Sequence, residues 1–281
     1  MEPNAFNLTA FEFENMMDEP KVWRFVADNW FLSVWSSVVY VIVIFGGRWL
    51  MEKQEKFGLN TTLAMWSGAL AIFSIFGTLR MWPEIIYVLR NESFYSSACK
   101  HGWREHQVTR FWTALFVLSK IIELGDTVFI VLRKQPLIFL HWYHHITVLI
   151  YTWYSYVEQT ATGRWFISMN FAVHAVMYSY YALRALKFRV PNQLRMIITL
   201  LQLLQMVVGC ILNFYTYNVK NQGQYCGITY NNLYYSFLMY FSYFILFAKF
   251  FYDAYISPPP RPIPSVRDEK HSIKARSRKA D

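Results

Sequence analysis

Charged residues are scarce in this chain. Asp, Glu, Lys and Arg make up 16% of its 281 residues, whereas an ordinary soluble protein carries about 25%. Apolar residues make up 55% and aromatic residues 20%. This balance is atypical of a soluble domain and typical of membrane helices with aromatic rings at both interfaces. The sequence therefore predicts an all-α integral membrane protein that is embedded in a lipid bilayer.

A cleavable signal peptide is also missing from the start of the sequence. The first 28 residues are acidic and contain no basic stretch followed by a short apolar run. The first strongly apolar segment begins near Trp30 and is long enough to remain as a membrane span. We expect it to act as its own targeting signal.

Seven apolar segments reach the length of about 20 residues that a membrane-spanning helix needs. They cover residues 30–50, 62–82, 111–132, 141–157, 165–183, 196–217 and 233–255. We therefore expect an N-terminal segment (1–29), a seven-helix membrane domain (30–255) and a tail (256–281). The tail is rich in Pro and then in charge, so it is predicted to be disordered.

The net charge of +9 does not indicate nucleic acid binding, because many of the basic residues lie in the tail. Membrane proteins keep such charge on the cytosolic side. A cytosolic C-terminus and an odd number of spans place the N-terminus on the lumenal side of the membrane. Two glycosylation sequons, at Asn7 and Asn91, then lie on the lumenal side, and a third at Asn60 lies on the cytosolic side.

Cysteine is rare, with three residues in the chain. Cys99 and Cys226 fall in lumenal loops, where oxidation is permitted, and Cys210 falls inside the sixth span. We predict a disulfide between Cys99 and Cys226. Two free thiols are the alternative.

Polar residues inside the expected spans follow helical stripes. Lys120, Glu123, Asp126 and Thr127 share one face of the third span. Ionisable groups at membrane depth normally face the interior of a helix bundle and mark functional sites. A structural ladder of ion pairs that holds the helices together is the alternative.

Histidine is limited to seven residues. His141, His144 and His145 open the fourth span with a spacing that places all three on one helix face, as in a metal site. A membrane di-iron enzyme needs further histidine clusters, and this chain cannot supply them. We therefore expect no metal, and an imidazole that acts as nucleophile or general base.

The next two spans carry polar stripes as well, which predicts a shared functional chamber. These residues are Asn170, His174, Tyr178 and Tyr181 in the fifth span and Gln202 and Gln205 in the sixth. Cations at the cytosolic mouth, including Arg133, Lys134 and Lys187, are candidates for binding a phosphorylated substrate. Their alternative role is to set the orientation in the membrane.

Four motifs occur in a fixed order along the chain. They are Lys120-Ile-Ile-Glu-Leu-Gly-Asp-Thr127, His141-Trp-Tyr-His-His145, Asn170-Phe-Ala-Val-His174 with Met177-Tyr-Ser-Tyr-Tyr181, and Thr199-Leu-Leu-Gln-Leu-Leu-Gln205. Together they resemble the elongation of very-long-chain fatty acids family. The resemblance implies a seven-helix protein of the endoplasmic reticulum, with six helices forming an inverted barrel around a narrow acyl tunnel.

The resemblance also implies the condensing step of fatty acid elongation. A long-chain acyl-CoA and malonyl-CoA give 3-ketoacyl-CoA, carbon dioxide and free CoA, without a cofactor. The middle histidine of the second motif, His144, would attack the acyl thioester. His174 would lie near the reacting carbons, and His141 and His145 would orient or polarise the centre. Lys120 joins the three mouth cations as a candidate for binding CoA phosphates and the malonyl carboxylate.

The motif His141-Trp-Tyr-His-His145 is similar to the type-six and type-three branch, which acts on saturated and monounsaturated acyl-CoAs. Partner proteins are expected among the other enzymes of the elongation cycle, namely ketoacyl-CoA reductase, dehydratase and enoyl reductase. The formation of a homodimer is a further possibility. A seven-helix receptor or transporter that binds a lipid without chemistry is the alternative from another class.

Overall fold

The computed structural model describes residue 6 and residues 8–257, so the predicted glycosylation site at Asn7 and most of the predicted tail lie outside the described residues. Within the described part every regular element is helical, which confirms the all-α prediction. The helices are α1 Glu12–Asn15, α2 Glu19–Asp28, α3 Phe31–Met51, α4 Asn60–Asn91, α5 Phe94–Cys99, η1 Gly102–Arg104, α6 Gln107–Glu123, α7 Gly125–Leu132, α8 Phe139–Glu158, α9 Gly163–Ala185, α10 Asn192–Asn221, α11 Tyr230–Phe251 and η2 Tyr252–Ile256.

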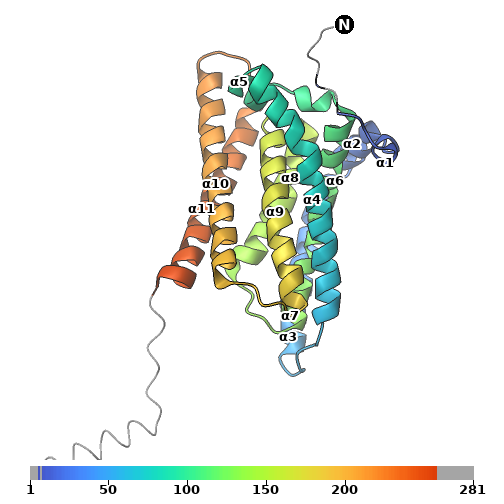
Figure 1. Ribbon diagram of the computed structural model, residues 1–281, viewed down its shortest axis with the longest axis vertical. Helices are drawn as coiled ribbons and strands as arrows, with labels where there is room; N and C mark the ends of the chain where they lie inside the picture. Colours follow the sequence, from blue (N-terminus) through green and yellow to red (C-terminus); the bar gives the residue numbers. More distant parts are fainter. Residues whose placement is uncertain (1–5, 7, 258–281) are drawn as a thin grey trace, which may run out of the picture.

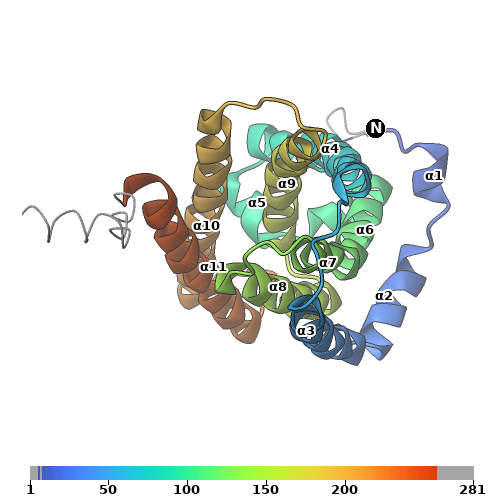
Figure 2. The ribbon, with the colours of Figure 1, turned by 90° about the horizontal axis from the view of Figure 1, so that it is seen from below.

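The long helices run along one axis and enclose a common interior (Figure 1). Contacts lead from α4 to α9, α10, α11, α8 and α6 and then back to α4. Seen along the axis, these helices form a closed ring, and α3 lies outside it against α7 and α8 (Figure 2). Side chains that point inward from this ring are shielded laterally by the surrounding helices.

Four helices in the described part of the chain are long and apolar enough to cross a membrane. They are α3, α4, α10 and the continuous helix Tyr230–Ile256. The helices α8 and α9 coincide with the expected fourth and fifth spans but carry inward-facing histidines and other polar side chains. These polar side chains lower the mean hydropathy, so composition identifies fewer crossing helices than the seven expected.

The expected third span, residues 111–132, is wrong as a single helix. It is divided at Leu124, whose amide donates to Ile121 O (3.3 Å) in a tighter turn than that of an α-helix. Gly125 follows, and a Cβ atom at this position would lie 2.6 Å from the Trp66 ring. This close approach lets Trp66 Nε1 donate to Asp126 Oδ1 at 2.6 Å. The break therefore positions a carboxylate.

A disulfide ties together one end of the ring, which we call the disulfide end. Cys99, the last residue of α5, is bonded to Cys226 in the loop between α10 and α11. The Gly227 amide donates to Cys99 O (2.9 Å), and Gly227 O accepts from the Ala161 amide (2.8 Å). Three connections of the ring are thereby joined at this end.

The N-terminal helices α1 and α2 pack against the outside of the ring, next to α6 (Figure 2). Glu14 is 0% exposed, and its Oε1 accepts from Arg80 Nε (2.8 Å) and from Trp112 Nε1 (2.7 Å). Further along the segment, Glu19 Oε1 accepts from the Tyr156 hydroxyl at 2.8 Å. The carboxylates of Glu14 and Glu19 therefore anchor the N-terminal segment to the ring. The sequence analysis predicted on which side of the membrane this segment lies but not these contacts.

Replacement of Glu14 by Ala should destabilise the protein. The Arg80 guanidinium would remain buried without its partner, and breaking a buried ion pair costs about 3 kcal/mol. We expect the Tm of the purified protein to fall by roughly 5 to 10 °C. Glu12→Ala is the matched control, because Glu12 lies in the same helix but is exposed. Equal Tm values for the two variants would contradict the anchoring role.

Gly125, which follows the helix break at Leu124, should not be replaceable by a larger residue. Gly125→Ala would displace Trp66 from Asp126, and crowding of this kind costs about 1 to 3 kcal/mol. Gly68→Ala, in the interior of α4 with open space around its Cβ position, should be neutral or stabilising by up to about 1 kcal/mol. Thermal unfolding followed by tryptophan fluorescence measures both variants. Equal Tm values for the two would rule out the close approach as the reason for glycine.

Candidate functional site

The largest described cavity opens at the end of the ring opposite to the disulfide. It has a volume of about 530 Å³, a size typical of ligand pockets, and we call it the outer cavity. Most of the site residues predicted from the sequence line it. They are Asp126, Arg133, His141, His144, His145, Asn170, His174, Tyr178, Tyr181, Gln202 and Gln205.

The other predicted residues do not line this cavity. Lys120, Glu123 and Thr127 are buried between helices. Lys134 and Lys187 are exposed, in left-handed backbone conformations just after α7 and α9. The Lys134 ammonium donates to Glu52 O at 3.1 Å instead of pointing inward.

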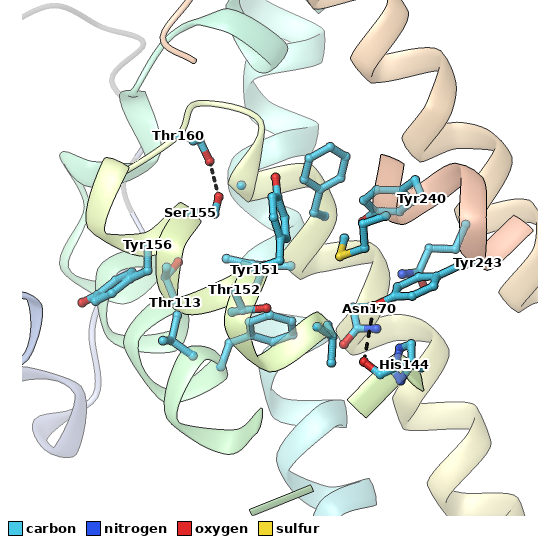
Figure 3. Close-up of a pocket in the computed structure, with 18 of the residues that line it drawn as sticks. Thr113, His144, Tyr151, Thr152, Ser155, Tyr156, Thr160, Asn170, Tyr240 and Tyr243 are labelled. Carbon is cyan, nitrogen blue, oxygen red and sulfur yellow. Dashed lines mark hydrogen bonds between the residues drawn. The ribbon is translucent and has the colours of Figure 1, made fainter. Parts of the chain in front are cut away.

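A second cavity continues from the first toward the disulfide end, and we call it the inner cavity. Its volume is about 70 Å³. His144, Asn170, Gln205 and Met206 line both cavities, so the two meet at these residues. Figure 3 shows His144 on one side of the inner cavity, with Ser155 and Thr160 on the other. The division into two compartments was not foreseen from the sequence.

A buried polar network lies behind the junction of the cavities. The Lys120 ammonium donates to Glu123 Oε1 (2.7 Å) and to Asn170 Oδ1 (3.0 Å). Asn170 Nδ2 lies 3.2 Å from His174 Nε2, and His174 Nδ1 lies 3.8 Å from Glu123 Oε2. Lys120 is 2% exposed, so its charge is balanced inside the protein. This pairing supports the ion-pair alternative for Lys120 and Glu123, which position the Asn170 and His174 side chains.

A second network fixes His141. The Thr127 hydroxyl lies 3.0 Å from His141 Nε2 and 2.7 Å from the hydroxyl of Tyr40. The sequence analysis missed Tyr40, although Ser33, Ser37 and Tyr40 share one buried face of α3. The same analysis missed Trp66, which shares the Asp126 carboxylate with the Tyr178 hydroxyl at 2.6 Å.

His144 differs from the other three histidines. It alone of the four lines both cavities, and its ring packs against Tyr243 with centroids 5.0 Å apart. Within the described part of the chain, hydrogen bonds to His144 reach its backbone carbonyl, where the Tyr243 hydroxyl donates at 3.3 Å. The imidazole nitrogens thus remain available to a bound molecule. Tyr243 was not predicted as a site residue.

Charge at the mouth of the outer cavity is positive. Arg133 and Arg184 line it, and Arg133 Nη2 is oriented by donation to Asn60 Oδ1 at 3.0 Å. Guanidinium groups bind phosphate oxygens through paired hydrogen bonds. Among the described residues no group of three or more His, Cys, Asp or Glu side chains has an arrangement that could hold a metal ion.

Comparison with known proteins agrees with this geometry. Residues 25–262 match the model of the GNS1/SUR4 family. The chain is 52% identical over 260 residues to putative fatty acid elongase 3 of Caenorhabditis elegans, covering 92% of this chain and 81% of the relative. It is 49% identical to very long chain fatty acid elongase 6 of Gallus gallus, covering 91% and 96%, and 45% identical to very long chain fatty acid elongase 3 of Homo sapiens, covering 83% and 86%. The chain therefore belongs to the GNS1/SUR4 family of fatty acid elongases.

Proposed function

We propose that this protein is a very-long-chain 3-oxoacyl-CoA synthase that condenses a long-chain saturated or monounsaturated acyl-CoA with malonyl-CoA. The observation that carries the proposal is the position of His144 at the junction of two cavities of different character. The outer cavity has arginines at its mouth for CoA phosphates. The inner cavity suits an acyl chain, since Met206 and Met239 among its walls can adapt their shape.

The reaction proceeds in two halves. A His144 ring nitrogen attacks the acyl thioester carbonyl, the carbon–sulfur bond breaks, and CoA leaves with a proton as the free thiol. Malonyl-CoA then enters the outer cavity and loses carbon dioxide, and the resulting enolate attacks the acyl-imidazole carbonyl. The new carbon–carbon bond forms as the bond to His144 breaks, and the departing ring nitrogen takes up a proton from solvent, which restores the neutral imidazole. Splitting the condensation in this way lowers each barrier, and no metal or other cofactor is required.

The neighbouring residues support this route. His174 and Asn170 line the outer cavity on the α9 side of His144, where they can polarise the thioester and enolate oxygens. His141, held by Thr127, and His145 orient the centre from the same helix. The closed ring limits the access of water to the open end of the outer cavity, which reduces hydrolysis of the acyl-enzyme.

The membrane arrangement is part of the proposal. The ring of α4, α6 with α7, α8, α9, α10 and α11 serves as the six-helix inverted barrel, and α3 supplies a seventh crossing. The protein resides in the endoplasmic reticulum with the disulfide end in the lumen, so the outer cavity opens to the cytosol. This orientation exposes the arginine-lined mouth to cytosolic acyl-CoA and the cysteines to an oxidising compartment.

Replacement of His144 by Ala should abolish elongation. We expect malonyl-CoA-dependent elongation by the purified protein to fall by at least roughly 1,000-fold, because the nucleophile is lost. His106→Ala, a histidine at the disulfide end outside both cavities, should retain activity. Incubation of the native protein with acyl-CoA alone should add the mass of one acyl group, and His144→Ala should not gain it. Full activity of His144→Ala would exclude the covalent route and favour a receptor or transporter.

Glycosylation should report the orientation. Asn91 is exposed at the disulfide end, whereas Asn60 begins α4 at the opposite end. In protein made in microsomes, Asn91→Gln should remove a glycan that endoglycosidase treatment releases from the native chain. Asn60→Gln should leave the gel mobility unchanged. A glycan lost with Asn60→Gln would reverse the orientation.

A further inference from the structure

The far end of the inner cavity is polar, although an acyl chain ends there in an apolar methyl group. Trp103 of η1, Thr113 of α6, Ser155 of α8 and Thr160 after α8 are polar members of the cavity lining. Figure 3 shows Thr113, Ser155 and Thr160 across the cavity from His144. We call these four residues the end group. Ser155 follows His144 by eleven residues along α8, a distance of about 16 Å and comparable with a long acyl chain.

Two members of the end group are buried without hydrogen-bond partners. Trp103 is 3% exposed and Thr113 is 2% exposed. Within the described part of the chain, neither Trp103 Nε1 nor Thr113 Oγ1 has a partner. Buried polar groups are nearly always satisfied, by protein or by ordered water. An unpaired donor beside a cavity therefore indicates a polar guest.

The other two members supply further capacity. The Ser155 and Thr160 hydroxyls lie 2.8 Å apart, so one of them donates to the other. Lone pairs on their oxygens can accept a further hydrogen bond. Together with the indole N–H and the Thr113 hydroxyl, the end group offers both donors and acceptors. A hydroxyl group can donate and accept at once, so it matches this set.

The charge and the volume of the inner cavity limit which polar group can bind there. The described residues that line the inner cavity include no Asp, Glu, Lys or Arg, so a carboxylate at this end would be buried without a counter-ion. The volume of about 70 Å³ is sufficient for water, which needs about 15 Å³ and two to four polar partners. A neutral hydroxyl satisfies both conditions.

The geometry points to a hydroxyl-binding subsite at the end group. Its guest is either an ordered water below an ordinary acyl chain or the terminal (ω) hydroxyl of a hydroxylated acyl chain. This inference rests on the proposed function and deepens it in two ways. ω-Hydroxyacyl-CoAs become substrates, and the upper length of unsubstituted chains is set by the loss of the water as well as by space.

The test compares unsubstituted and ω-hydroxylated acyl-CoAs of graded length, with malonyl-CoA and the purified full-length protein. At the longest accepted length we expect kcat/KM to be about tenfold higher for the hydroxylated chain, since one buried group regains its partner. At short lengths, where the chain end does not reach Thr113, the ratio should be near one.

Thr113→Val removes the hydroxyl at nearly constant volume, so the fold should be retained. The ratio of the hydroxylated to the unsubstituted chain should fall toward one, and longer unsubstituted chains should be elongated faster. Trp103→Phe, which removes the indole N–H, should act in the same direction. Thr216→Val is the matched control, because Thr216 is a buried threonine of α10 that lines neither cavity.

The outcomes separate the two sources of the hydroxyl. If the native protein prefers the ω-hydroxylated chain and Thr113→Val does not, the subsite binds the terminal hydroxyl of that chain and can also bind water. Faster elongation of long unsubstituted chains in Thr113→Val, without that preference in the native protein, supports water alone. An unchanged ratio and an unchanged length limit in both Thr113→Val and Trp103→Phe would overturn the subsite.

A binding measurement keeps the subsite distinct from the proposed function. If the native protein elongates neither chain, the proposed function fails, and the rise in Tm on adding each acyl-CoA still decides the subsite. A larger rise with the hydroxylated chain in the native protein, absent in Thr113→Val, supports it. Equal rises in both proteins would refute it.

Discussion

Lys120 and Glu123 must balance each other's charge, because both side chains are buried between helices. A buried charge without a partner costs several kcal/mol. The Lys120 ammonium meets both Glu123 and Asn170 within 3.0 Å, so the rotation of α6 relative to α9 is restricted. That restriction directs His174 and Asn170 into the outer cavity. The interactions that stabilise the ring thus also place the polar groups of the proposed reaction centre.

The break between α6 and α7 supplies a second constraint. In a continuous helix, Asp126 and Thr127 would follow the periodicity of α6. The tight turn at Leu124 interrupts that periodicity, so the side chains of α7 have their own register. In that register Asp126 accepts from both Trp66 and Tyr178, and Thr127 contacts His141. His141 is then held by Thr127, while His174 contacts Asn170. His144 is left facing both cavities, which is the condition that a nucleophile requires.

Helical periodicity and hydropathy predicted much of this arrangement from the sequence. Polar residues three or four positions apart share a face. The stripes in the fifth and sixth segments do line one cavity, whereas the third segment contributes Asp126 alone of its four polar residues. Periodicity gives the face of a residue but not its depth or its partner. It therefore could not distinguish Lys120, which is paired internally, from Arg133, which reaches the cavity. It also could not indicate Glu14 or Trp103, which lie in short segments whose contacts are with residues far away in the sequence.

Under the proposed function, the different character of the two cavities lets one site bind two CoA thioesters in turn. The outer cavity has arginines at its mouth and a volume suited to a polar carrier, whereas the inner cavity is narrow and neutral. A CoA phosphate that entered the inner cavity would lose its solvation without gaining a counter-ion. Under the proposed function, therefore, only the acyl chain passes His144, and the thioester stops beside the imidazole. Once CoA has left, the chain remains held in the inner cavity and the outer cavity is free for malonyl-CoA. The order of the two substrates follows from the division of the cavities.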